Sequence, residues 1–547
     1  MKKITLLLFI VFSQTILSAA KITQTEKLAA TCKVWGFLKY YHPKVAGGEA
    51  NWDMQLLEKL PKIEKAETKE EFSLILENWI DDLGPIKEIA PIVIPKEVEF
   101  FDKNFDLSWF NNKLFSKKLS KKLKYIEDNR FQSNEEFGPD FEGFKNGEYS
   151  NLDYKDKNSR ILMLFAYWNL MEYYFPYKYV MDQKWDFTLE QALPKIIDVK
   201  EENDFFILIK KMTAKLNDSH VQFAIYGPLG IGRKSNYFPA NGKIIDEKIV
   251  ITEILGDSLA EADNIKIGDV ITKIDDKTIA ALILENRDLI SASNESSYLA
   301  KLPKVLFKSH SETVKVEFLK DGKYETKSMT WFDYHDSHRN EFKKGALKIK
   351  EKFKLLDNNI GYVNMGVIKP RHIPGMIEAL KSTKAIVFDM RNYPNGTWKE
   401  ISDFLNAQEK KFCDYTMPYL NYPGRFVWTE GRKCGFENKD NYKGKVIVLL
   451  NEESISQSEW TAMCFQTAGN TIIIGSQTAG ADGNVFELDV NGFHTMYSGI
   501  GVYYPDHRET QRIGIVPDIE VKPTIKGIQE GKDEVLDRAL LFVETGK

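Results

Sequence analysis

Residues 449–460 read LLNEESISQSEW, and this stretch decides how the last third of the chain is expected to fold. An apolar run ends at Leu450, a short polar turn follows, and a helix is predicted to begin near Ser456. A serine at a helix N-terminus lies beside free backbone N–H groups and the positive end of the helix dipole, which stabilise an oxyanion. Serine is also a favoured N-cap residue with no catalytic role, so this stretch alone leaves both interpretations open.

Further strand-like runs lie on both sides of that turn. They are apolar, bounded by turn residues and separated by helical stretches, and they cover residues 360–364, 385–389, 446–450 and 471–474. Such an alternation predicts a βαβ-type sheet with helices packed on it. We therefore expect residues 341–547 to form an α/β core.

Upstream of the core, residues 235–340 change to short strands with period-two alternation. The run IGDVITKID at residues 267–275 suggests two strands joined through a Gly-Asp turn, and this region resembles a PDZ domain. PDZ domains bind extended peptide ends by adding a strand to a sheet edge. A generic β-barrel or a spacer between domains is the alternative.

The first half of the chain contains an internal repeat with a constant offset of 133 residues, which aligns Trp35 with Trp168 and Trp52 with Trp185. Apolar residues recur at helical spacing in both copies, which predicts two small helical bundles at residues 21–115 and 159–234. Residues 116–158 are charged and turn-rich, which is typical of a connector with one or two surface helices. Only the second copy ends in Ser219-His220.

Residues 1–20 are predicted to be a signal peptide, with two lysines, a short apolar run and small residues at the end. We therefore expect an exported protein, periplasmic or secreted, with no stable membrane insertion. A net charge of −4 provides no basic field for nucleic acid. Four cysteines permit disulfides in an oxidising compartment, and Cys413 with Cys434 is the suspected pair.

The run Asn451-x-x-Ser454-x-Ser456-x-Ser458-Glu459 resembles the motif of C-terminal-processing (tail-specific) serine peptidases. The Gly-x-x-Thr-x-Gly turn at residues 475–480 and the Asp-x-Arg loop at residues 389–396 also resemble that family. The resemblance implies a multidomain α/β protein with a ClpP/crotonase-like peptidase core, N-terminal helical repeats and an inserted PDZ-like module. It also implies that Ser456 is the nucleophile.

The same resemblance implies that the backbone N–H groups of Gly396 and Gln457 form the oxyanion hole. Many relatives use a Ser–Lys pair, with the lysine directly after the Thr-x-Gly turn. Here Ala481 occupies that position, and no lysine occurs from residue 471 to residue 507. A Ser–Lys mechanism therefore has no base in the expected place.

The chain is instead similar to the tricorn-core branch, which uses Ser, His and Glu and whose His follows a Ser. That similarity implies His220 as general base, with Ser219 helping to position the site. His494 is the rival base. The carboxylate that orients the imidazole is expected before the Gly-Ile-Val-Pro-Asp run at residues 514–518, which leaves Glu509 and Gln511 open, with Asp218 as a further possibility.

These observations predict an exported serine endopeptidase or carboxyl-terminal-processing peptidase that forms an acyl-enzyme on Ser456. We expect a peptide or protein substrate and neither a cofactor nor a metal. The oligomeric state stays open. The alternatives are a catalytically silent peptidase-fold protein that binds a peptide or a hydrophobic ligand, and a PDZ-type adaptor.

Overall fold

The computed structural model describes residues 21–133, 153–225, 235–333, 342, 351–490 and 493–547. The predicted signal peptide lies outside the described residues. Among the described residues, none of the helices has both the length and the apolar character needed to cross a membrane. The chain divides into two compact units, one formed by residues 1–92 and 107–131 and the other by residues 93–106 and 132–547.

The first unit is a helical bundle that contains the first copy of the repeat. Its helices bury their apolar faces against one another, and they are α1 (Gln24–Tyr41), α2 (Pro43–Ala46), α3 (Trp52–Lys65), α4 (Lys69–Asp82) and α5 (Lys117–Asp128). Thr23 and Thr68 begin α1 and α4 with capping boxes. Helix α5 packs on α4, and its Leu119 and Leu123 are fully buried. The boundary predicted at residue 116 therefore falls inside this unit, because α5 is part of the bundle rather than of a connector.

The second copy of the repeat lies in the second unit and forms three helices, α6 (Lys157–Tyr174), α7 (Trp185–Asp198) and α8 (Glu202–Ala214). These bounds follow those of α1, α3 and α4 at the offset seen in the sequence. The chain then runs through Ser219 and His220 into strand β2 (Gln222–Ile225). Strand β2 pairs antiparallel with β20 (Phe493–Ser498), which in turn pairs with β19 (Val485–Val490).

A β-rich module follows, with an antiparallel sheet in the order β10-β9-β6-β5-β4. Its strands are β4 (Ala240–Ile245), β5 (Lys248–Ile254), β6 (Val270–Ile274), β9 (Thr313–Lys320) and β10 (Lys323–Thr330). Strand β4 is an edge strand, and helix α11 (Glu295–Leu306) packs beside it. An edge strand next to a helix is the geometry that accepts an added peptide strand.

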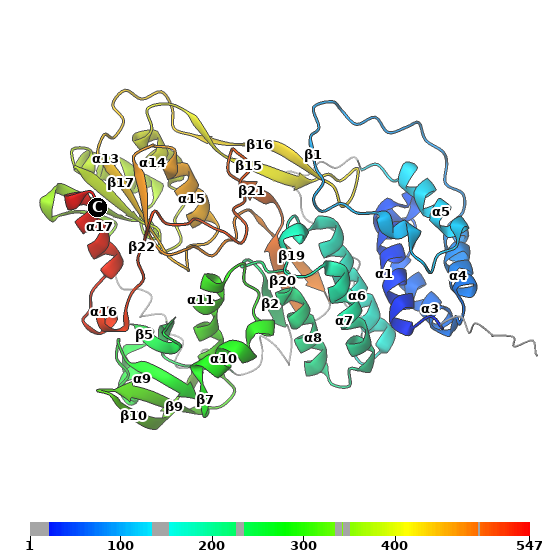
Figure 1. The fold of residues 1–547 in the computed structure, drawn as a ribbon, viewed down its shortest axis with the longest axis horizontal. Helices are drawn as coiled ribbons and strands as arrows, with labels where there is room; N and C mark the ends of the chain where they lie inside the picture. The colour runs from blue at the N-terminus through cyan, green and yellow to red at the C-terminus, as the bar shows by residue number, and fades with distance from the viewer. Residues whose placement is uncertain (1–20, 134–152, 226–234, 334–341, 343–350, 491–492) are drawn as a thin grey trace, which may run out of the picture. The chain divides into compact units, whose positions relative to one another are not determined.

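The core is a six-stranded sheet in the order β12-β13-β14-β17-β18-β22, parallel except for β12. Its strands are β12 (Phe353–Leu356), β13 (Ile360–Asn364), β14 (Ala385–Asp389), β17 (Lys445–Leu450), β18 (Thr471–Gly475) and β22 (Ile519–Glu520). Helices cover both faces (Figure 1): α13 (Ile373–Leu380), α14 (Trp398–Leu405) and α15 (Gln457–Gln466) on one, and α17 (Glu534–Thr545) on the other.

The suspected Cys413–Cys434 disulfide is wrong, because all four cysteines are free thiols. Cys413 lies in β15 (Lys410–Pro418) and Cys434 in β16 (Phe426–Cys434), which pair antiparallel. The register places Cys413 opposite Arg432 and Cys434 opposite Lys410. The two thiols are therefore not cross-strand neighbours, and a bridge between them would require a change of register.

Candidate active site

Ser456 lies at the sharp turn between strand β17 and helix α15. Its backbone has φ 57° and ψ −121°, which is not the extended conformation of an ordinary N-cap residue. A positive φ is strained for a residue with a β-carbon, and such strain persists where the surrounding structure enforces it, above all at active sites. A strained strand-to-helix turn is also how the nucleophile is presented in α/β-hydrolases. The conformation favours the catalytic interpretation of Ser456 over the capping one.

The flanking serines of the motif hold this turn in place. Ser454 Oγ donates to the carbonyl oxygen of Met390 at 2.9 Å, and Ser458 Oγ donates to that of Asn392 at 3.2 Å. Both carbonyls belong to the loop after β14, so this loop is fastened to the turn on either side of Ser456. Alternate serines in the motif thus have a structural role, and the one between them is left half-buried.

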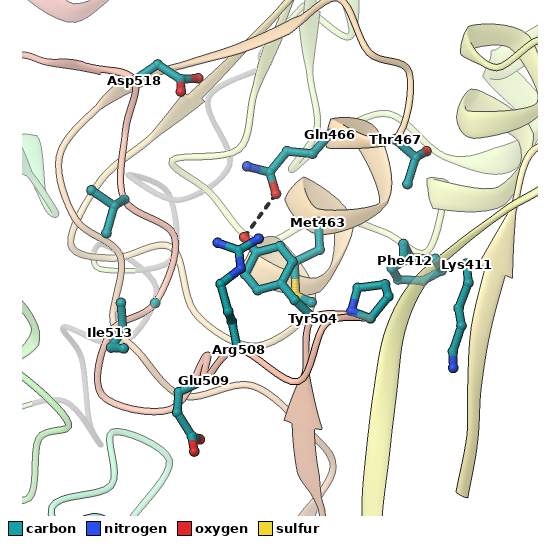
Figure 2. A pocket seen from close by; sticks show the side chains of 13 residues that line it. Lys411, Phe412, Met463, Gln466, Thr467, Tyr504, Arg508, Glu509, Ile513 and Asp518 are labelled. Atoms are coloured by element: carbon teal, nitrogen blue, oxygen red, sulfur yellow. Dashed lines mark hydrogen bonds between the residues drawn. The ribbon is translucent and has the colours of Figure 1, made fainter.

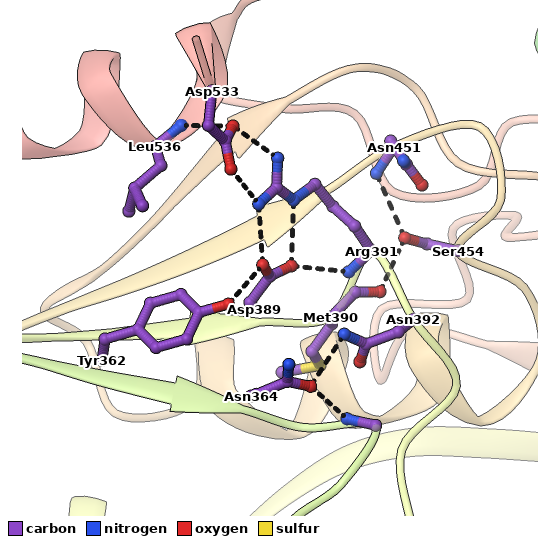
Figure 3. Close-up of polar contacts among 11 residues, drawn as sticks. Tyr362, Asn364, Asp389, Met390, Arg391, Asn392, Asn451, Ser454, Asp533 and Leu536 are labelled. Atoms are coloured by element: carbon purple, nitrogen blue, oxygen red, sulfur yellow. Dashed lines mark hydrogen bonds and ion pairs between the residues drawn. The ribbon is translucent and has the colours of Figure 1, made fainter. Parts of the chain in front are cut away.

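The loop after β14 is itself held by a network of charged and amide side chains (Figure 3). Arg391 forms paired bonds to Asp389 and to Asp533, all between 2.7 and 2.9 Å, and Tyr362 donates to Asp389 at 2.9 Å. Bidentate Arg–carboxylate pairs fix orientation as well as charge. This network anchors the start of the loop that carries Gly396.

Both predicted oxyanion donors lie at this junction. Gly396 adopts φ +68°, a conformation natural to glycine, and a β-carbon placed on it would lie 3.8 Å from Gln457 Nε2. Gln457 is the first residue of α15, where backbone N–H groups have no partner within the helix. The same loop brings the Tyr393 hydroxyl to 3.5 Å from Ser456 Oγ, a contact that sequence reasoning missed.

Glu459 is a buried carboxylate beneath the turn, and it was also missed. It accepts bonds from the backbone N–H groups of Ser456 at 3.1 Å, Gly480 at 2.8 Å and Ala481 at 3.1 Å. Burial raises the pKa of Glu459 to about 7, and these bonds oppose that shift. Ala481, which occupies the lysine position of the Ser–Lys relatives, thus belongs to a turn whose backbone N–H groups bond to Glu459.

That turn also receives the end of the second helical repeat. Ser219 Oγ donates to the carbonyl oxygen of Ala479 at 2.8 Å, and the Ser456 N–H donates to that of Ala481 at 2.9 Å. Ser219 and Ser456 thus bond to carbonyls two residues apart. The structure brings the predicted base segment and the predicted nucleophile to the same turn, although they are distant in sequence.

His220 is buried, with 6% of its surface exposed. Its Nδ1 lies 2.8 Å from Ser498 Oγ, and its Nε2 has no hydrogen-bond partner among the described residues. Burial lowers the pKa of His220, the nearby Asp218 opposes this shift, and Lys301 adds to it. A neutral imidazole with a free nitrogen can accept a proton. His494, the rival base, lies in β20 opposite Ala224.

The prediction that Glu509 or Gln511 orients His220 directly is wrong. Glu509 accepts bonds from Tyr179 at 2.6 Å and from Lys103 at 3.1 Å, because its backbone pairs with Tyr503 beside them. Gln511 is buried, and its Nε2 lies 3.4 Å from Asp218 Oδ1. Neither side chain bonds to His220; the hydroxyl of Ser498 holds that position.

Helix α11 of the β-rich module forms hydrogen bonds to the segment that carries His220. Lys301 Nζ donates to the carbonyl oxygens of Ser219 at 2.6 Å and Ser291 at 2.8 Å, and Ser219 Oγ lies 2.8 Å from Ser297 Oγ. Burial lowers the pKa of Lys301 to about 8. The module also contacts the turn before Ser456, where Lys243 pairs with Glu452 at 2.6 Å. No local sequence pattern indicated these long-range contacts.

A pocket of about 620 Å³ lies at the other end of α15 (Figure 2). Met463 and Gln466 of the helix line it, as do Glu509 and Tyr504, whose hydroxyl donates to Gln466 at 3.0 Å. Neither Ser456 nor His220 is among its lining residues. The reacting groups therefore lie outside this pocket.

Comparison with known proteins agrees with this geometry. Residues 359–521 match the model of peptidase family S41, and residues 222–296 match the PDZ domain model. The chain carries a peptidase family S41 domain. Peptidase family S41 is a family of serine peptidases. The PDZ match begins at residue 222, before the boundary predicted at residue 235.

Two bacterial relatives and one solved structure illustrate the similarity. A probable CtpA-like serine protease of Staphylococcus haemolyticus is 27% identical over 282 residues, which are 50% of this chain and 50% of that protein. A carboxy-terminal-processing protease of Bartonella bacilliformis is 26% identical over 213 residues, which are 36% of this chain and 46% of that protein. The chain therefore spans about half the length of these curated relatives. The crystal structure of mature CPAF is 13% identical in sequence and superposes with a TM-score of 0.55. The match covers 70% of this chain and 97% of CPAF, and it shows a similar fold.

Proposed function

We propose that this protein is an exported serine endopeptidase of the carboxyl-terminal-processing type, which hydrolyses peptide bonds through an acyl-enzyme on Ser456 with His220 as general base. The observation that carries the proposal is the meeting of two features at one turn. The turn at residues 479–481 accepts bonds from the N–H of a strained Ser456 and from the hydroxyl of Ser219, and the next residue, His220, is buried with a free Nε2. The narrower ClpP/crotonase-like assignment of the core belongs to the same proposal.

The chemistry follows the acyl-transfer template. His220 Nε2 takes the proton of Ser456 Oγ, which attacks the scissile carbonyl carbon. The resulting oxyanion accepts hydrogen bonds from the N–H groups of Gly396 and Gln457. His220 then protonates the leaving amine, and a water molecule activated by the same imidazole releases the acyl group from Ser456.

The PDZ domain is proposed to present the substrate. Its edge strand β4 and helix α11 flank an apolar pocket of about 260 Å³, lined by Phe238, Ala240 and Phe307 among others. An extended peptide can add to β4 by backbone bonds and place an apolar side chain in this pocket. Lys304, which also lines the pocket and pairs with Glu453 at 3.4 Å, is the cation proposed to attract a carboxylate end.

A fluorophosphonate probe tests the proposal, because it reacts only with an activated serine. We expect stoichiometric labelling, an adduct on Ser456 by peptide mass spectrometry, and loss of labelling in Ser456→Ala and in His220→Ala. Circular dichroism on both variants checks that each is folded. A folded wild-type protein that is not labelled would contradict the peptidase proposal and favour a catalytically silent binding protein.

A further inference from the structure

We propose that Asp218, acting through the hydroxyl of Ser498, is the positioning carboxylate for His220, in place of the glutamate of Ser-His-Glu peptidases. This proposal rests on the proposed peptidase function. It assigns the orienting task to Asp218, which the sequence left open as a further possibility beside Glu509 and Gln511, and it adds Ser498 as the group through which Asp218 acts. Asp218 and Ser498 are both fully buried.

The register of the β2–β20 pair explains why these residues meet. Gln222 lies opposite Met496 in this antiparallel pair. Continuing the same register by two residues brings His220 opposite Ser498, the last residue of β20. The contact is therefore built into the sheet that joins the second helical repeat to the S41 domain, and a side-chain rotation alone would not create it.

Asp218 is surrounded by donors. Its Oδ1 accepts from the His220 N–H at 3.0 Å, from Ser498 Oγ at 3.1 Å and from Gln511 Nε2 at 3.4 Å. Its Oδ2 accepts from the Ser498 N–H at 2.7 Å. A carboxylate only accepts hydrogen bonds, so Ser498 uses its single hydroxyl proton toward Asp218.

This arrangement determines the tautomer of His220. Because the Ser498 proton points to Asp218, its oxygen can only accept from the imidazole, and the proton of neutral His220 must lie on Nδ1. Nε2 then carries the lone pair, and it is the nitrogen without a partner among the described residues. The pair Asp218–Ser498 thus leaves the correct nitrogen available to Ser456.

The charge of Asp218 also allows it to stabilise the imidazolium form of His220. When His220 takes the Ser456 proton it becomes an imidazolium, which a nearby carboxylate stabilises and an amide such as Gln511 does not. Lys301 is a second charged group beside His220, and its positive charge acts in the opposite direction. Tyr167 and Tyr177 also face Asp218, and burial keeps the pKa of each well above its usual value, so both stay neutral.

The tautomer can be measured without any reaction. Histidine labelled with ¹⁵N, with His220 assigned from the His220→Gln variant, should show a protonated Nδ1 and an unprotonated Nε2 above the pKa of the imidazole. We expect Ser498→Ala and Asp218→Asn to shift His220 toward a mixture of tautomers and Ser498→Thr, which keeps a hydroxyl, to retain the wild-type signal. An unchanged tautomer in both Ser498→Ala and Asp218→Asn would overturn the proposal.

Labelling kinetics provide the second readout. Asp218→Asn should slow fluorophosphonate labelling of Ser456 by roughly 10²-fold and displace its pH profile to lower pH, because the imidazolium loses its carboxylate. Glu509→Gln is the matched variant of the alternative carboxylate and should change the rate by less than about threefold, since Glu509 bonds to Tyr179 and Lys103. A larger loss of labelling rate in Glu509→Gln than in Asp218→Asn would overturn the proposal.

The two proposals fail in different ways. If wild-type Ser456 is not labelled, the peptidase function is wrong, while the ¹⁵N signals still report whether Asp218 and Ser498 set the tautomer. If wild-type Ser456 is labelled and Asp218→Asn is labelled equally fast with the same pH profile, the peptidase stands and Asp218 is not its positioning carboxylate.

Discussion

The two helical repeats of this chain are built alike and end differently. Helices α1 and α6 each have 18 residues, and α3 and α7 each have 14. In the first copy the Trp52 indole donates to the carbonyl of Trp35 at 2.9 Å, and in the second the Trp185 indole donates to that of Trp168 at the same distance. The internal architecture of one bundle is thus reproduced in the other.

A buried cation is also shared. Lys27 in α1 donates to the carbonyls of Glu64 and Ala66 at the end of α3. Its counterpart Arg160 in α6 donates to the carbonyls of Ile196 and Ile197 at the end of α7. In each copy a positive side chain satisfies the last carbonyls of the second helix, where the helix dipole favours it.

The difference begins after the third helix. In the first copy the chain leaves α4 through Leu83 and Gly84, and Pro85 is exposed. In the second copy it leaves α8 into Asp218, Ser219 and His220, all buried. The same helical scaffold therefore precedes an exposed segment in the first copy and a buried one in the second. The proposed chemistry depends on the contacts of the buried segment at residues 218–220 with α11, strand β20 and the turn of Ser456.

The largest expected effect compares the buried histidines of the two copies. His220→Gln should slow fluorophosphonate labelling of Ser456 by about 10³-fold, because it removes the proposed base. His42→Phe, which puts the second-copy residue into the first copy, should leave the labelling rate unchanged. Rate constants at neutral pH decide the comparison. Equal losses in both variants would mean that His220 acts through the fold rather than through its imidazole.

The pH dependence of labelling has a definite sign. Burial lowers the pKa of His220 below its ordinary 6.5, so the neutral base already predominates at neutral pH. The labelling rate should rise with pH, with a midpoint below that ordinary value, and reach a plateau near neutrality. A rate profile measured in buffers of constant ionic strength tests this expectation. A midpoint above 7.5, roughly one unit higher, would contradict a buried neutral base.

An intermediate effect is expected at the buried cations. Arg160→Met and Lys27→Met should each lower the free energy of unfolding of its own unit by about 3 kcal/mol, because buried carbonyls lose their charged donors. Urea unfolding measures this loss. Lys21→Met is the matched control. Lys21 is exposed and pairs with the exposed Glu67, so this substitution should lower the free energy of unfolding by less than about 0.5 kcal/mol. Equal losses at all three positions would show that the shared cations are not structural.

Much of this fold could be predicted from local sequence. The strands predicted at residues 360–364 and 385–389 are β13 and β14, because apolar runs between turns determine buried parallel strands. Helix α15 starts one residue after Ser456, where the polar turn indicated it. These features depend on a few neighbouring residues, so a single sequence contains the signal for them.

The contacts around His220 could not be predicted in this way. Ser498 meets His220 only because β2 pairs with β20 in one particular register, and no local pattern specifies a pairing between such distant segments. The choice between Glu509 and Gln511 failed for a related reason, since the backbone pairing of Glu509 with Tyr503 directs its side chain to Tyr179. Motifs indicated which segments meet, and register decided which side chains touch.

The smallest expected effect tests whether the two bundles are equivalent as scaffolds. Trp52→Phe and Trp185→Phe remove the corresponding indole donor from each copy, and each should cost about 1–2 kcal/mol of unfolding free energy. The second copy has a reciprocal bond from Trp168 to Trp185, made to the backbone carbonyl, which the substitution leaves in place. The two losses should therefore agree within about 0.5 kcal/mol, as followed by circular dichroism in urea.

Labelling of Ser456 in the same two variants completes this comparison. Both Trp185 and Trp52 lie within helical cores, and the segment at residues 218–220 is held by α11 and β20. We therefore expect both variants to be labelled at the wild-type rate under native conditions. Suppose that Trp185→Phe alone is labelled tenfold more slowly, while both variants lose the same free energy of unfolding. That result would show that the packing of the second bundle positions His220, so that the bundle and the segment at residues 218–220 do not act independently.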